Sequence, residues 1–383
     1  MKKVIAKKQP AVYFENLDAL RFVAFFVVFT HHIFGVLYFK ADNVYASEFI
    51  NRCLMNGNLG VNFFFVLSGF LITYLLLKEK QATETIRVRN FYLRRALRIW
   101  PLYFLVLLIS FYIIPACGGY KGNPKINHGL YFLFMGNVDL VKHGVGNFLV
   151  SVLWSVSIEE QFYLFWPIFM LFVPFKHLFK FLALVVILSI SFRLWGHTGK
   201  TENLMLSYHT LSCIYNLAIG GIIGYLAMNG QMIEKFKKMS RLLIVCVYIA
   251  GITLIIIQKD ILLLQEKGSY SIEAVLPLFY ALFFAFIILE QVFAERSLFK
   301  MGRIPFFTKL GKISYGLYCF HMIMIYILMN RLTAYKFNTG NPGGLLFFLE
   351  STAAFALTIL VSWLSYRFIE KRFLNYKSKI AEA

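Results

Sequence analysis

The sequence is poor in cysteine, with five in 383 residues, and no two of them form a CxxC pair. An odd number of cysteines without this spacing argues against a bound metal and against a disulfide framework. Three of them, Cys213, Cys246 and Cys319, fall in segments apolar enough to be membrane spans. Only Cys53 and Cys117 therefore remain as candidates for a disulfide outside the membrane.

Motifs of common nucleotide and metal enzymes are missing as well. The chain contains no GxGxxG, no GxxxxGKS/T and no HExxH, and it shows no internal repeat. It therefore gives no sign of a dinucleotide-binding fold, a P-loop or a zinc protease helix. Residues 374–383 form a short basic tail after the last apolar segment, so we expect no soluble C-terminal domain and a single domain over residues 1–383.

Acidic residues are half as frequent as basic ones, 19 against 39, whereas 59% of the residues are hydrophobic. Such a chain is too apolar for a soluble fold, and apolar runs of about 17 to 25 residues, long enough to cross a bilayer, recur along it. We predict an all-α, polytopic transmembrane helix bundle with about ten spanning helices. The predicted spans are residues 19–39, 58–77, 99–116, 155–174, 180–196, 208–228, 241–258, 273–293, 312–330 and 344–368.

A shorter apolar patch, Leu130 to Met135, lies between the third and fourth predicted spans. It is too short to cross a bilayer. We predict a re-entrant or interfacial segment, which needs protein or a wet cavity around its backbone.

Lysine and arginine are distributed unevenly over the segments between the predicted spans. With a cytoplasmic N-terminus, 27 of the 39 fall on the cytoplasmic side and 11 on the opposite side, while Arg21 lies within a span. Cytoplasmic loops carry the excess of positive charge. We therefore predict a multi-pass protein of the inner or plasma membrane with both termini cytoplasmic, residues 1–16 forming a basic N-terminal segment. The net charge of +20 then reflects topology and contacts with membrane lipids, and no nucleic-acid partner is expected.

Two ionisable residues, Arg21 and His32, lie within the first predicted span. They are eleven positions apart, which places both on one helix face about 16.5 Å apart along the axis. A charge and an imidazole are costly in hydrocarbon and usually line a functional cavity. The structural alternative for His32 is a buried histidine that donates to a carbonyl of a neighbouring helix.

Polar residues also gather in three further segments, GVNFFFVLSGFLI (60–72), FYLRRALRIWP (91–101) and LWSVSIEEQFYLFWP (153–167). In the last of these, Ser155, Glu159 and Tyr163 stand four positions apart and so project from one helix face, with Glu160 turned about 100° away. A carboxylate held there would be stabilised by a cation or a histidine.

The pair Arg21 and His32 and these three segments resemble the motifs of the acyltransferase-3 family of integral membrane O-acyltransferases, of the O-antigen acetyltransferase type. The resemblance extends to SYGLYCFH (314–321) and SYRFIEKRF (365–373). The matching residues follow the family order from residue 17 to residue 373. The resemblance therefore covers essentially the whole chain.

The resemblance implies transfer of an acyl group, usually acetyl, from cytoplasmic acyl-CoA to a hydroxyl of a cell-surface glycan or a related acceptor such as a lipid-linked sugar. Arg95 and Arg98 look like the family's paired arginines. Together with Arg21 they are expected to bind the acetyl-CoA donor, because phosphate is recognised by guanidinium groups in forked geometry.

By the same resemblance, His32 is the general base that takes the proton of the acceptor hydroxyl. Glu159 would hold the ring nitrogen of His32 or position the acceptor. A transient acyl-enzyme on His32 is a second route that the sequence leaves open. The residues expected to contact the substrate are Ser68, Ser157, Tyr163 and His321.

Each of these roles has a structural alternative. Arg95 and Arg98 could be ordinary positive-inside anchors, and Ser68 and Gly69 could simply let two helices approach closely. For the whole chain, the alternative is a transporter or flippase of a lipid-linked glycan or small solute. Transporters often show two related halves, which this sequence lacks.

Overall fold

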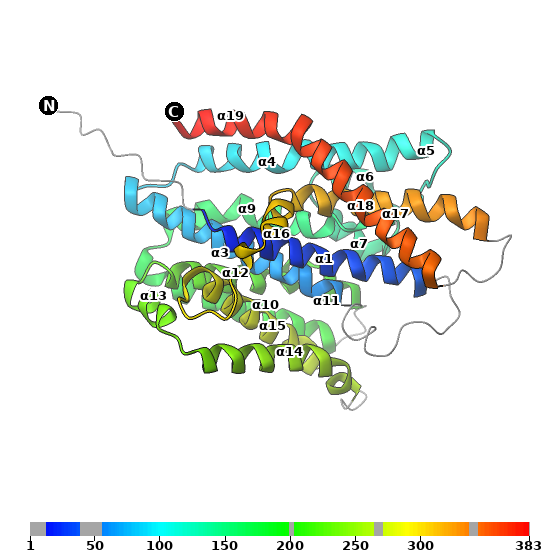
Figure 1. The fold of residues 1–383 in the computed structure, drawn as a ribbon. Coiled ribbons are helices and arrows are strands. Elements are labelled where there is room, and N and C mark those ends of the chain that lie inside the picture. The colour runs from blue at the N-terminus through cyan, green and yellow to red at the C-terminus, as the bar shows by residue number, and fades with distance from the viewer. Residues whose placement is uncertain (1–12, 39–55, 199–202, 264–270, 337–343, 383) are drawn as a thin grey trace.

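In the computed structural model, the described residues are 13–38, 56–198, 203–263, 271–336 and 344–382, and they form helices without any strand. The long helices run roughly parallel to one another in one bundle (Figure 1). The predicted all-α class is confirmed. The helices are α1 (Glu15–Tyr38), α3 (Gly57–Thr83), α4 (Val88–Leu108), η1 (Ile109–Ile113), α5 (Ile114–Ala116), α6 (His128–Phe132), α7 (Gly136–His143), α8 (Phe148–Ser151), α9 (Trp154–Phe172), α10 (Phe175–Thr198), α11 (Asn203–Tyr208), α12 (Thr210–Leu226), α13 (Gly230–Lys237), α14 (Arg241–Leu263), α15 (Ser271–Phe293), η2 (Met301–Arg303), α16 (Pro305–Lys312), α17 (Ser314–Lys336), α18 (Gly344–Ser365), η3 (Tyr366–Glu370) and α19 (Lys371–Glu382).

Nine helical segments among the described residues are long and apolar enough to cross a membrane. A tenth is made by α16 and the first part of α17, which meet at an angle of 77°. Each predicted span overlaps one of these ten segments, so the predicted count is confirmed.

Different helices begin or end at the two ends of the bundle. In Figure 1 the start of α1, the short α13 and the end of α19 lie at one end, whereas α5 and the end of α17 lie at the other. The first and last helices thus have their outer ends on the same side, as an even number of crossings requires. Predictions for residues 1–12 and for Cys53 lie outside the described residues, and Cys117 is an exposed free thiol.

Helix α3 lies at the centre of the bundle. Of an apolar stretch of 18 residues in α3, 72% are buried in the protein, compared with 17% of the corresponding stretch in the peripheral helix α14. It packs closely against α12. A Cβ atom at Gly69 would lie 2.0 Å from the Leu217 carbonyl oxygen, and one at Gly220 would lie 2.1 Å from the Val66 carbonyl oxygen. Close helix approach through small residues is therefore the role of Gly69.

The third span begins earlier than predicted. Helix α3 continues to Thr83 and α4 already begins at Val88, so residues 78–98, between the second and third predicted spans, are mostly helical. Arg95 and Arg98 consequently lie within α4. The predicted span began too late because it excluded charged residues, whereas here the helix includes arginines that line a polar cavity.

The apolar patch from Leu130 to Met135 does not form a span. It is divided between α6 and the turn before α7, where Phe134 adopts a positive φ of 55°. Together with α7 and α8, it connects α5 to α9 and packs against α4 and α9. The prediction of a segment too short to cross is confirmed.

Candidate active site

A cavity of about 490 Å³ lies among α1, α3, α4, α9, α17 and η3. At the end of the bundle where α1 begins, it is lined by the exposed residues Tyr13, Leu75 and Lys312. Polar groups from these six separate segments of the chain meet in the cavity. The ionisable and hydroxyl side chains on its wall include Asp18, Arg21, Ser68, Arg95, Arg98, Ser155, Glu159, Tyr163, Ser314, Tyr315, Tyr318, Tyr366 and Glu370.

Arg21 is held on this wall by its neighbour one turn earlier. Its guanidinium forms an ion pair with Asp18, and the other oxygen of Asp18 accepts a hydrogen bond of 2.7 Å from the Tyr13 hydroxyl. Partial burial and this hydrogen bond raise the pKa of Tyr13 to about 12, so the hydroxyl keeps its proton at neutral pH. The wall at Arg21 is therefore fixed in place before any ligand arrives.

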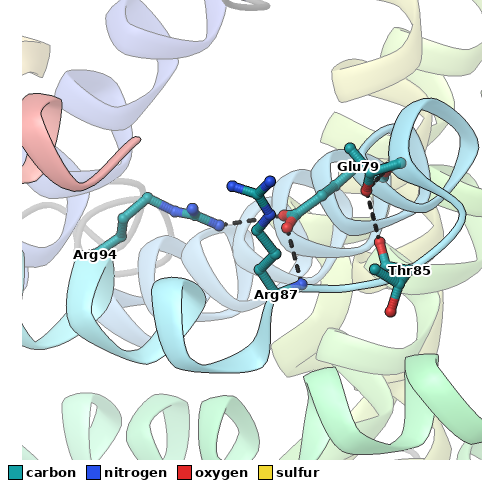
Figure 2. Close-up of polar contacts among 5 residues, drawn as sticks. Glu79, Thr85, Arg87 and Arg94 are labelled. Atoms are coloured by element: carbon teal, nitrogen blue, oxygen red, sulfur yellow. Dashed lines mark hydrogen bonds and ion pairs between the residues drawn. The ribbon is translucent and has the colours of Figure 1, made fainter. Parts of the chain in front are cut away.

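The three arginines at the start of α4 differ in what they contact. Figure 2 shows Arg94 reaching the Glu79 carboxylate on α3, at 3.3 Å, while the other Glu79 oxygen accepts the Arg87 amide at 3.0 Å. Glu79 thus joins the end of α3 to the start of α4. This contact leaves Arg94 outside the cavity and turns the next two arginines, Arg95 and Arg98, into it.

Neither Arg95 nor Arg98 forms a hydrogen bond or an ion pair with any described residue. The Arg95 guanidinium instead lies over two aromatic rings, 5.5 Å from the centre of Tyr163 and 5.7 Å from that of Phe91. Arginine at a cavity wall with its forked N–H donors unused is a ready partner for an anion.

Glu159 faces the same cavity and uses both oxygens. One accepts a hydrogen bond of 2.8 Å from the Ser68 hydroxyl on α3, and the other accepts one of 2.9 Å from the Tyr163 hydroxyl one turn along α9. Ser155, a turn before Glu159, contacts the Tyr318 hydroxyl at 2.7 Å. The predicted shared face of Ser155, Glu159 and Tyr163 is therefore confirmed, because all three line the cavity.

His32 and His321 form a pair between α1 and α17. His321 Nε2 lies 3.2 Å from His32 Nδ1, and the two ring centres are 5.1 Å apart. His32 Nδ1 is also 2.9 Å from the Val28 carbonyl oxygen of its own helix. His321 is completely buried, whereas His32 is partly accessible.

The histidine pair lies just beyond the described cavity. Helix α17 lines the cavity as far as Tyr318, and His321 follows one helical turn later, with its ring 5.7 Å from that of Tyr318. On α1, Arg21 lines the cavity and His32 does not. The arginines and the histidine pair thus occupy successive levels of the bundle, separated by the ring of Tyr318.

The model of the acyltransferase 3 family, described as an acyltransferase domain, matches residues 14–367. The chain belongs to this family. Its described helices and this match make it a multi-pass membrane protein of the acyltransferase 3 family.

Several proteins similar to this chain are named for O-acetyl transfer. One from Staphylococcus aureus (strain MRSA252) is 26% identical over 98% of this chain and 61% of its own length. Peptidoglycan O-acetyltransferase OatA of Listeria monocytogenes is 25% identical, over 95% of this chain and 57% of its own length. O-acetyltransferase OatA of Staphylococcus aureus (strain NCTC 8325) is 26% identical over 96% and 58%. The chain thus spans about three-fifths of these relatives, and no solved structure matches it.

Two of the predictions for individual residues do not agree with the structure. Ser157 is completely buried and donates to the Leu153 carbonyl of its own helix, away from the cavity lining. It stands two positions from Ser155, or about 200° around the helix, so it cannot share that face. Of the two roles predicted for Glu159, the bond to the ring of His32 is not found. The Ser68 and Tyr163 hydroxyls donate to the two Glu159 oxygens, and His321 contacts the ring of His32. His321 belongs to this pair and not to the cavity wall.

Several ionisable or hydroxyl groups of the cavity were not predicted from the sequence, among them Glu370, Tyr318 and Lys312. Glu370 in η3 is buried, lines the cavity and accepts a hydrogen bond of 3.2 Å from Ser365. Tyr318 and Lys312 line it from α17 and from the bend before it. Their signal was present, since Tyr318 and Glu370 lie within SYGLYCFH and SYRFIEKRF, which were used only to identify the family.

Proposed function

We propose that the protein is an O-acetyltransferase that moves an acetyl group from acetyl-CoA, arriving from the cytoplasm, to a hydroxyl of a cell-envelope glycan. The observation that carries this proposal is the pair Arg95 and Arg98, which line the cavity without an ion-pair partner among the described residues. With Arg21 and Lys312 they give the cavity an excess of positive charge over Asp18, Glu159 and Glu370.

An anionic donor fits this charge better than a neutral sugar does. Coenzyme A carries a diphosphate and a further phosphate, and guanidinium groups bind phosphate oxygens through two parallel hydrogen bonds. The thin pantetheine arm between phosphate and thioester would extend along the cavity toward Tyr318. The basic segments between the predicted spans favour the cytoplasm for the end where the donor enters.

His32 would supply the general base. Its Nδ1 faces the Val28 carbonyl, which can only accept, so the Nδ1 position carries the proton and Nε2 keeps a free lone pair. Nε2 takes the proton of the acceptor hydroxyl as its oxygen forms a bond to the thioester carbonyl carbon. The carbon–sulfur bond then breaks, and the imidazolium returns the proton to the departing thiolate.

Glu159 would act on the donor side and not on the base. Its carboxylate accepts a hydrogen bond of 2.9 Å from the Tyr163 hydroxyl, and the Arg95 guanidinium lies over the Tyr163 ring, 5.5 Å from its centre. These contacts run from Ser68 through Glu159 and Tyr163 to Arg95. They would hold the Arg95 guanidinium in position to bind a phosphate of the donor. In this proposal Ser68 and Tyr163 support donor binding and do not contact the acceptor.

The acceptor is proposed from the relatives. The Listeria relative is named for peptidoglycan, so a peptidoglycan hydroxyl is the first acceptor to test. A lipid-linked sugar of the same envelope is the second.

The test uses membranes from cells that produce the protein and from cells that lack it. With acetyl-CoA and isolated peptidoglycan, the producing membranes should release free thiol and add acetyl ester to the glycan, as measured by mass spectrometry. Movement of a glycan across the membrane without thiol release would support a transporter instead and would overturn the proposal.

A further inference from the structure

We infer that His321 is a positioning residue that fixes the ring of His32 with its Nε2 free for the acceptor hydroxyl, an inference that rests on the proposed function of His32. The two residues are 289 positions apart in the chain and meet only because α1 packs against α17.

The hydrogen bond of His321 to its own helix decides which of its nitrogens carries the proton. His321 Nδ1 lies 2.6 Å from the carbonyl oxygen of Tyr318. A carbonyl oxygen can only accept, so Nδ1 of His321 is the donor, and a neutral imidazole has one such proton. Nε2 of His321 is therefore an acceptor, and it points at His32.

Two acceptors therefore face the same nitrogen of the His32 ring. Nδ1 of His32 lies 2.9 Å from the Val28 carbonyl oxygen and 3.2 Å from His321 Nε2. Both contacts are satisfied only if Nδ1 of His32 carries the proton. Nε2 is thereby left as the basic nitrogen, and the same N–H stays bonded after Nε2 takes a proton.

The surroundings of His321 keep its ring from turning. The side chain is completely buried, with the edge of the Phe25 ring packed at 5.8 Å between centres and the Tyr318 ring at 5.7 Å. A polar ring at such a place is costly unless both nitrogens are bonded. Here one nitrogen donates to Tyr318 and the other accepts from His32.

This arrangement resembles a catalytic triad with one difference. In a triad a carboxylate accepts from the ring of the base and fixes its tautomer and orientation. Here the acceptor is a neutral imidazole, which brings no negative charge into a buried site. The carboxylate that sequence analysis expected in this place, Glu159, is engaged with Ser68 and Tyr163.

The experiment compares His321→Gln and His321→Leu with the unchanged protein in detergent-purified form. A glutamine oxygen still accepts the His32 proton, whereas leucine fills space without accepting. His177, exposed near the start of α10, serves as the matched site for a His177→Gln control. Each variant is first checked for folding by its thermal unfolding midpoint and gel-filtration profile.

The positioning role predicts a fall in kcat of about tenfold or more for His321→Leu, an unchanged KM for acetyl-CoA, and recovery of at least about a third of kcat in His321→Gln. His177→Gln should match the unchanged protein. Full kcat in folded His321→Leu, equal loss in both His321 variants, or a raised donor KM would overturn the inference. Failure of the proposed function is separate, because it appears as no thiol release by the unchanged protein, or as full activity in His32→Gln if only the role of His32 is wrong.

Discussion

The hydroxyl of Ser68 on α3 donates a hydrogen bond of 2.8 Å to the carboxylate of Glu159 on α9, across 91 positions of the chain. The second oxygen of Glu159 is taken by Tyr163, so the carboxylate is a fixed part of the cavity wall. The Arg95 guanidinium lies over the ring of the same Tyr163. The bond between Ser68 and Glu159 therefore links the packing of α3 and α9 to the guanidinium proposed to bind the donor.

Ser68→Ala should weaken both the fold and donor binding. Loss of a buried hydrogen bond to a carboxylate costs about 1 to 3 kcal/mol, since Glu159 keeps only Tyr163 as a partner. We expect a lower thermal unfolding midpoint in detergent and a raised KM for acetyl-CoA. Ser297→Ala is the control, because the Ser297 hydroxyl is exposed and bonds only a nearby carbonyl. Equal midpoints for the two variants would contradict this assignment of the Ser68 hydroxyl.

Arg98→Gln should raise the KM for acetyl-CoA by about ten- to a hundredfold and change kcat little, because a charge-assisted bond to phosphate is lost equally in the ground and transition states. Arg94→Gln, four positions earlier, removes a guanidinium that pairs with Glu79 outside the cavity. Its donor KM should remain near that of the unchanged protein. An unchanged donor KM in Arg98→Gln would assign Arg98 to the positive-inside anchors, and an equal rise in both variants would contradict a specific role of Arg98.

Gly220→Ala should prevent the close packing of α3 and α12. The added methyl group would lie 2.1 Å from the Val66 carbonyl oxygen, within the backbone of the facing helix. Overpacking of this kind typically costs about 1 to 3 kcal/mol. Gly230→Ala, where no atom lies within 4 Å of the added carbon, is the matched control. The midpoints of thermal unfolding in detergent give the comparison, and equal values would show that the helices can move apart freely.

Hydropathy and helix periodicity were sufficient for the spans and for one wall of the cavity. Apolar runs of spanning length are set by bilayer thickness, and positions four apart necessarily share a helix face, as Ser155, Glu159 and Tyr163 do. The same periodicity excludes Ser157 from that face. Ser157 was predicted to contact the substrate because it is a serine, and not because of its position on the helix.

Contacts between distant segments could not be predicted in this way. The distinction between Arg94 and its neighbours Arg95 and Arg98 depends on Glu79, which approaches from another helix. The pairing of His32 with His321 depends on how α1 and α17 pack. Sequence periodicity gives the face of one helix, and it carries no information on which residue of another helix lies opposite.

The central claim is that the imidazole of His32 accepts the proton of the acceptor hydroxyl. It is tested most directly by measuring thiol release from acetyl-CoA and acetyl ester on peptidoglycan for purified His32→Gln, with His177→Gln as control. The account predicts loss of both products in His32→Gln, by about a hundredfold or more, at an unchanged unfolding midpoint. Full release of thiol and full acetylation by folded His32→Gln would contradict it.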